Sequence, residues 1–211
     1  MTIVLIAIVL YLAAATLLVL GVRRDAGPVR HWLLPALGAV ALHAGSHAMA
    51  WRHSGSADMH FFAALSLVGL GMAALTTLVG ALGRMAALGV MVFPLAALAL
   101  LGYHVYGHVP AQPLDWRLQL HAWFALLAYA TLAVAALLAV MLWLQERALR
   151  RRDFHGWLRA LPPLVELETL LFRTIAVGFV LLSATLLTGM LFVENLLVQH
   201  LVHKTALSVL S

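Results

Sequence analysis

The stretch that decides the fold runs from residue 118 to residue 144, LQLHAWFALLAYATLAVAALLAVMLWL, and contains no Lys, Arg, Asp or Glu. About 20 apolar residues in a helix cross the ~30 Å hydrocarbon core of a bilayer, so this stretch is long enough to span it. Because lipid offers the backbone no hydrogen bonds, an α-helix is the economical conformation for such a run. Similar runs recur at 2–22, 31–51, 60–83, 85–103 and 168–193. The sequence therefore predicts an all-α, polytopic transmembrane helix bundle with six full spans.

Composition supports this class of protein and excludes several others. Of the 211 residues, 64% are hydrophobic and only 10% are charged, whereas a typical soluble domain has about 25% charged residues. Cysteine is absent, which excludes disulfides, thiolate nucleophiles, iron–sulfur clusters and covalent attachment of haem to this chain. The net charge is +5, but the arginines lie in short loops between apolar runs. We therefore predict a lipid bilayer as the partner and no nucleic acid.

The two ends of the chain call for separate interpretations. No Lys or Arg precedes the first apolar run, and Arg23 and Arg24 follow it, which is opposite to a signal peptide. We expect a retained first span. A further apolar stretch begins near Leu201 and stops at Ser211, too short to span alone. We expect residues 1–211 to be a single transmembrane domain truncated at the start of a seventh helix; the alternative is a C-terminal segment on the membrane surface.

The distribution of basic residues predicts an orientation. Loops one, three and five of the predicted bundle hold nine arginines, and loops two and four hold two, Arg52 and Arg117. Basic residues are concentrated in cytoplasmic loops of membrane proteins. We therefore predict a multi-pass membrane protein whose odd-numbered loops lie in the cytoplasm and whose N-terminus lies outside.

Histidines gather on the side that this orientation places outside. Nine of the eleven fall there, and His43, His47 and His121 lie within spans. His43 and His47 are one helical turn apart, and His121 opens the fifth span, so we expect imidazoles from two helices at comparable depths. Neutral imidazole is a common ligand of haem iron, and bundles build cofactor sites from facing helices. The small residues Ala44 and Gly45 would leave room for a flat macrocycle. Haem b, with His43 and His121 as iron ligands, is therefore one candidate for a cofactor at these residues.

Other interpretations of these residues stay open. A single membrane histidine often only joins two helices by a hydrogen bond, which is worth about 1 kcal/mol. His43 and His47 could instead bind zinc or copper, although no carboxylate or thiolate lies near them in sequence. A small transporter would show inverted repeats, which are absent here. A haem-based quinone oxidoreductase would usually need two histidine pairs at different depths. We find no nucleophile–base pattern or phosphate loop, and so we predict no enzyme.

Three segments between His121 and Gly189 carry a resemblance to a known family. They are HAWFALLAYAT at 121–131, LPPLVELETLLFR at 161–173, and GFVLL at 178–182 through to Thr188 and Gly189. The segment around His43 also fits. In these segments the chain resembles the cytochrome c assembly (CcsA-like) integral membrane proteins, and in particular their YpjD-type inner-membrane branch.

The resemblance implies a protein that binds or handles haem, in contact with other cytochrome-assembly membrane proteins. It places the chain in the bacterial inner membrane, puts His43 and His121 at in-membrane ligand positions, and makes His203 the counterpart of an outer-loop histidine. His47, one helical turn from His43, is a further candidate ligand from its spacing. One departure concerns the tryptophan-rich WWD segment of the fuller family. The corresponding loop here, FVENLLVQH at 192–200, has no tryptophan. The alternative is therefore a membrane scaffold or accessory protein of this family that does not bind haem.

Overall fold

The computed structural model describes residues 2–23, 30–55, 58–82, 85–107, 115–151 and 163–192. Over these residues the chain forms six α-helices and one short 3₁₀ helix, with no strand. They are α1 (Thr2–Arg23), α2 (Leu33–Ser54), α3 (Phe61–Leu82), η1 (Met85–Leu88), α4 (Gly89–Tyr106), α5 (Trp116–Arg150) and α6 (Leu164–Phe192). All six α-helices are long and apolar enough to cross a membrane. The prediction of six spans is confirmed, whereas the start of a seventh falls outside the described residues.

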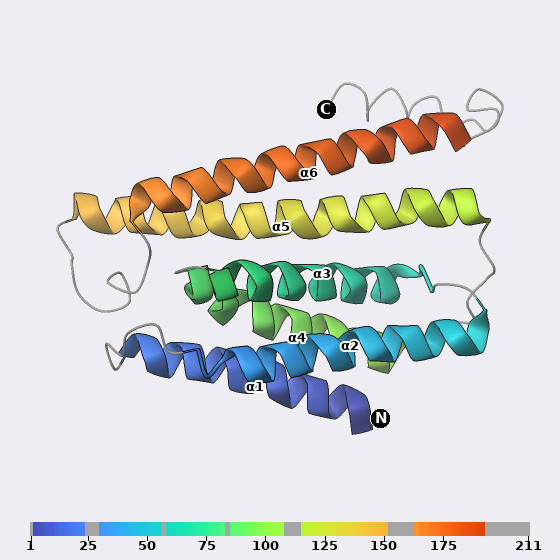
Figure 1. Ribbon diagram of the computed structural model, residues 1–211, viewed down its shortest axis with the longest axis horizontal. Helices are drawn as coiled ribbons and strands as arrows, with labels where there is room; N and C mark the ends of the chain where they lie inside the picture. The colour runs from blue at the N-terminus through green and yellow to red at the C-terminus, as the bar shows by residue number, and fades with distance from the viewer. Residues whose placement is uncertain are drawn as a thin grey trace.

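The helices pack as two groups, and α3 of the first group contacts the second. In the first group α1 packs on α2 and α4, and α3 packs on α2 and α4. The second group is the pair α5 and α6, which lie side by side along much of their length (Figure 1). α3 also packs on α5 and so joins the groups. α2 therefore packs mainly on α1 and α3, and it meets α5 at the ring contact between Trp51 and Trp123.

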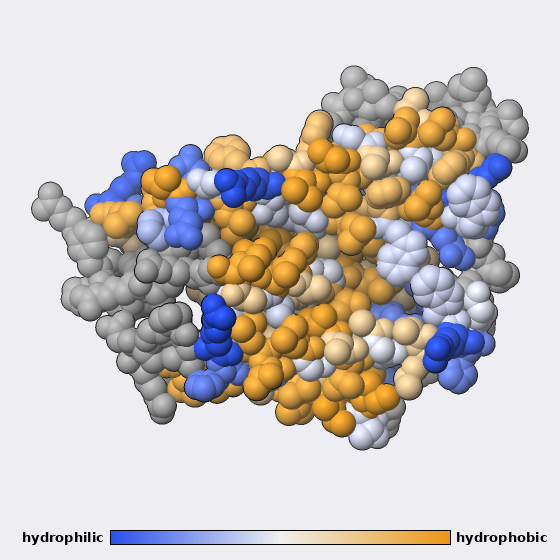
Figure 2. All heavy atoms as spheres, viewed as in Figure 1, coloured by the Kyte–Doolittle hydropathy of each residue, from blue (hydrophilic) through white to orange (hydrophobic). Residues whose placement is uncertain are grey.

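Charged residues lie at the two ends of the bundle and apolar residues lie between them. α1, α3 and α5 end, and α2, α4 and α6 begin, at what we call the arginine-rich end, which carries Arg30, Arg147, Arg150 and Arg151. The opposite, histidine-rich end carries His53, His60, His104 and His121. Figure 2 shows an apolar belt between these polar ends. Many leucines in the belt are exposed, Leu37 and Leu98 among them, as a surface covered by lipid would be. That the N-terminus lies outside stays a prediction.

Close approaches between small residues hold α3, α5 and α6 together. A Cβ atom on Gly71 of α3 would lie 2.8 Å from the Cβ atom of Ala130 on α5. On the other side of α5, a Cβ atom on Gly178 of α6 would lie 2.6 Å from Cδ2 of Leu132. Small residues at such positions let helix backbones approach closely, which strengthens van der Waals packing where no hydrophobic effect operates. The glycines therefore fix how near α5 comes to its neighbours.

Candidate functional site

His43 is completely buried and hydrogen-bonded through both ring nitrogens. Its Nδ1 lies 3.1 Å from the hydroxyl of Tyr11 on α1, and its Nε2 lies 2.9 Å from the hydroxyl of Ser66 on α3. A neutral imidazole has one N–H donor and one acceptor nitrogen, so one hydroxyl donates to the ring and the other accepts from it. Because a buried polar group without a partner is costly in lipid, this network explains how α2 tolerates a histidine within its span. His43 thus joins three helices.

His47 forms a hydrogen bond with the same serine. Its Nε2 lies 2.9 Å from Oγ of Ser66, and its ring stacks on Tyr103 of α4 with the centroids 4.6 Å apart. A serine hydroxyl has one proton and two lone pairs, so it can serve both imidazoles at once. We call Tyr11, His43, Ser66 and His47 the Tyr11 network. His43 and His47, one helical turn apart, thus bond to the same residue of α3.

His121 belongs to a different part of the bundle, between α5 and α6. Its Nδ1 lies 3.1 Å from the backbone oxygen of Thr185 and 3.2 Å from Oγ1 of Thr188. A carbonyl oxygen can only accept, so the Nδ1 atom carries the proton. The Thr188 hydroxyl directs its one proton to the backbone oxygens of Ala184 and Thr185, so a lone pair can accept from Nδ1.

This tautomer leaves the other nitrogen of His121 with a lone pair. Within the part of the chain that the structure describes, Nε2 of His121 has no hydrogen-bond partner, and the side chain is half-buried rather than enclosed. The ring packs closely on Gly189, where a Cβ atom would lie 3.2 Å from Cε1. A backbone carbonyl that holds Nδ1–H is the usual way in which a metal-binding histidine is oriented.

The structure brings His43 and His47 together on Ser66, whereas among the described residues His121 shares no hydrogen-bond partner with either. The rings of Trp51 on α2 and Trp123 on α5 are in contact, with their centroids 6.1 Å apart. His43 lies eight residues before Trp51, and His121 lies two residues before Trp123. Because α2 and α5 run in opposite directions (Figure 1), His43 lies on the arginine-rich side of Trp51, and His121 lies on the histidine-rich side of Trp123. Hydrogen bonds among the described residues join His43 and His121 to different partners, and their comparable depth stays a prediction.

Several residues that hydrogen-bond to or stack on the histidines were not predicted from the sequence. Tyr11, Ser66 and Tyr103 were not singled out, although Tyr11 is the one aromatic hydroxyl in its apolar run. A second pair, His60 and Asp58, forms a hydrogen bond at the histidine-rich end, with both side chains largely buried. Among the described residues, no three His, Cys, Asp or Glu side chains gather as a metal site. The predicted ligand His203 lies outside these residues.

Six membrane-length helices with hydrogen-bonded histidines in their spans define a polytopic helical membrane protein. The model of the cytochrome c assembly protein family matches residues 32–211, and the chain belongs to that family. The matched region begins in the turn before α2 and so leaves out α1, which carries Tyr11.

The curated relatives include YpjD proteins, as the predicted YpjD-type branch requires. The inner membrane protein YpjD of Escherichia coli (strain K12) is 32% identical over 104 residues, which are 49% of this chain and 38% of that protein. An uncharacterized 28.8 kDa protein of Azospirillum brasilense is 35% identical over 96 residues, which are 44% of this chain and 35% of that protein. The chain thus aligns with well under half the length of these relatives. No solved structure matches it.

Proposed function

We propose that this is an inner-membrane protein of cytochrome c assembly that binds haem b without a covalent bond, with His121 as an iron ligand. The family and the inner-membrane relatives support the setting. The observation that carries the ligand assignment is the hydrogen bond from Nδ1 of His121 to the backbone oxygen of Thr185. It leaves Nε2 unprotonated, and iron binds the unprotonated nitrogen of a neutral imidazole.

The other predicted ligands fit haem to different degrees. His47 is half-buried, and only its Nε2 has a partner among the described residues. His43 is enclosed, and it would have to release Tyr11 or Ser66 before either nitrogen could bind iron. We therefore rank His121 first, His47 second and His43 third, and keep His203 as a candidate. Haem bound here would supply an iron centre. Other membrane proteins of cytochrome assembly would take part in delivering that haem.

One observation favours a second candidate function, a membrane scaffold that binds no haem. Both nitrogens of His43 are satisfied by hydroxyls from neighbouring helices, as in a purely structural network. In that case the histidines would stabilise helix packing, and the protein would act through its contacts with other assembly proteins.

An absorption spectrum separates the two functions. The protein is expressed with ample haem, purified in detergent, and measured oxidised and reduced. We expect a haem band in the unmodified protein and its loss in His121→Ala. His53→Ala is the matched control, because His53 is exposed at the same end and its one hydrogen bond to a described residue is with the Met49 backbone oxygen of its own helix. A colourless unmodified protein would favour the scaffold. A band unchanged in His121→Ala would remove His121 as a ligand.

A further inference from the structure

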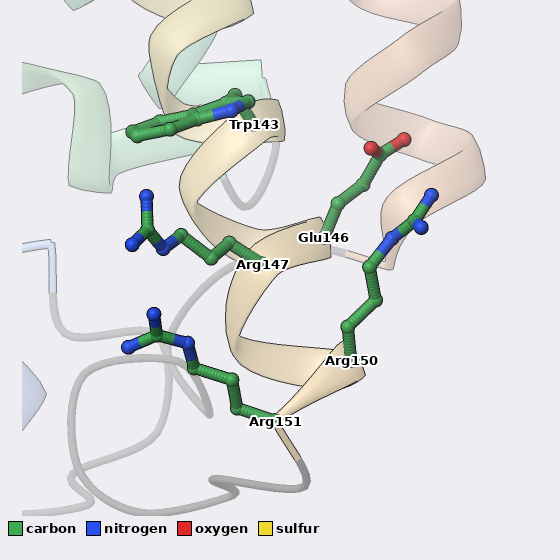
Figure 3. A pocket seen from close by; sticks show the side chains of 5 residues that line it. All are labelled: Trp143, Glu146, Arg147, Arg150 and Arg151. Carbon is green, nitrogen blue, oxygen red and sulfur yellow. The ribbon is translucent and has the colours of Figure 1, made fainter.

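The last turns of α5 present a tryptophan and two arginines on one face. Trp143, Arg147 and Arg151 follow one another at intervals of four residues, and such residues lie on one side of a helix. Figure 3 shows their side chains extending in the same direction, while those of Glu146 and Arg150 extend to the other side of the helix. Together these five residues line an open pocket of about 440 Å³. None of them belongs to the histidine site.

The positive charge of this face is not neutralised within the described part of the chain. The guanidinium carbon of Arg147 lies 5.3 Å from the ring centroid of Trp143, a cation–π contact. None of the three arginines forms an ion pair with a described carboxylate, and all three are exposed. The side chains are thus free to bind an anion from outside the chain.

The length of α5 places this face at the level of lipid headgroups. The helix has 35 residues and is therefore about 50 Å long, while the hydrocarbon core measures about 30 Å. Its apolar run ends at Leu144, so the arginines that follow lie in the interfacial layer. Tryptophan is enriched at this depth, where its ring meets the hydrocarbon and its N–H meets the headgroups.

We propose that Trp143, Arg147 and Arg151 bind the phosphate group of an anionic phospholipid of the phosphatidylglycerol class. A guanidinium group donates two parallel hydrogen bonds to phosphate oxygens, and two guanidiniums one turn apart can hold one phosphate between them. A headgroup without an amine suits the face, because a headgroup ammonium would be repelled by the three arginines. Basic pockets at the ends of transmembrane helices are known to bind anionic lipid headgroups.

The arginines also have a simpler role that needs no specific lipid. Cations at a helix C-terminus interact favourably with its carbonyl groups, and arginines in loops set membrane topology. Neither effect distinguishes one phospholipid from another. A preference between lipids that depends on Arg147 and Arg151 therefore tests the proposal directly.

Native mass spectrometry of the detergent-purified protein provides the test. Phosphatidylglycerol and phosphatidylcholine are titrated separately, and bound lipid is counted. We expect preferential binding of phosphatidylglycerol, weakened about fivefold by Arg147→Gln and by Arg151→Gln singly. Arg117→Gln is the matched control, because Arg117 lies over Trp116 at the opposite end of α5, 5.7 Å from its ring. It should leave the preference unchanged.

Three results would overturn the proposal. Equal binding of the two lipids would show that no anionic headgroup is selected. An equal loss in Arg117→Gln would show that net charge, not this face, attracts the lipid. Displacement of phosphatidylglycerol by millimolar inorganic phosphate would assign the arginines to a soluble anion instead of a lipid. Because the substituted side chains are exposed, unchanged thermal unfolding of both single variants confirms that any loss arises at the pocket.

Discussion

The hydroxyl of Tyr11 lies 3.1 Å from Nδ1 of His43, so the first helix supplies a partner for a completely buried imidazole on the second. The two rings also meet edge-on, with their centroids 5.9 Å apart. On its other side Tyr11 stacks on Phe93 of α4. One tyrosine therefore fixes the position of α1 against both α2 and α4.

Tyr11→Phe should destabilise the bundle by about 1 kcal/mol, because it removes one hydrogen bond between helices and leaves a nitrogen of His43 unpaired in an apolar interior. Unfolding in detergent, followed by circular dichroism, measures the effect. The control is Tyr129→Phe, since Tyr129 is 60% exposed on α5. Equal stability of the two variants would show that the Tyr11 hydroxyl contributes nothing.

Ser66→Ala should cost more than Tyr11→Phe, because His43 and His47 both bond to this hydroxyl. Ser46→Ala is the matched control: Ser46 donates to the His43 backbone oxygen of its own helix and bonds to no other helix that the structure describes. A double-mutant cycle of Ser66→Ala with Tyr11→Phe should show non-additive losses, since both hydroxyls bind one ring. Additive losses would contradict a shared network.

The tautomer of His121 can be measured without haem. Nitrogen-15 NMR of histidine-labelled protein distinguishes protonated from unprotonated ring nitrogens, and His121→Ala assigns the signals. We expect a proton on Nδ1 and a lone pair on Nε2, because the backbone oxygen of Thr185 can only accept. Thr188→Val should leave this tautomer unchanged, since that carbonyl remains. A proton on Nε2 would contradict the geometry and remove the basis for His121 as the first ligand.

Gly71→Ala should separate α3 from α5 and destabilise the protein by about 1–3 kcal/mol, because the new methyl group would lie 2.8 Å from Cβ of Ala130. Alanine 130 has no flexible side chain that could move aside. Gly45→Ala is the control, because its added Cβ would meet no atom within 4 Å. Unfolding of both variants in detergent checks the prediction, and an equal loss in Gly45→Ala would attribute the effect to glycine itself.

The spans could be predicted from the sequence because length and apolarity are local properties. All six runs became helices, with ends displaced by a few residues; the start of the fourth is the 3₁₀ helix Met85–Leu88. The partners of the histidines could not be predicted, because they depend on which helices pack together. His43 needed Tyr11 from α1 and Ser66 from α3, and a tyrosine within an apolar run was the signal available.

The position of His121 relative to His43 could not be predicted from the sequence, for a related reason. Each residue was placed correctly on its own helix, but the offset between α2 and α5 is set by packing. The contact between Trp51 and Trp123, where these two helices meet, is visible only in the folded structure. Likewise, nothing in the spacing of His121 indicates the backbone oxygen of Thr185, which is 64 residues away in the chain.

Helix α3 offers Ser66 to α2 and Gly71 to α5 within five residues of one another. A sideways displacement or rotation of this one helix would therefore strain the imidazole network and the α5 packing at the same moment. The two helix groups are mechanically coupled through it. A large molecule that bound between α2 and α5 would have to separate Trp51 from Trp123, while α3 kept its place between the two helix groups.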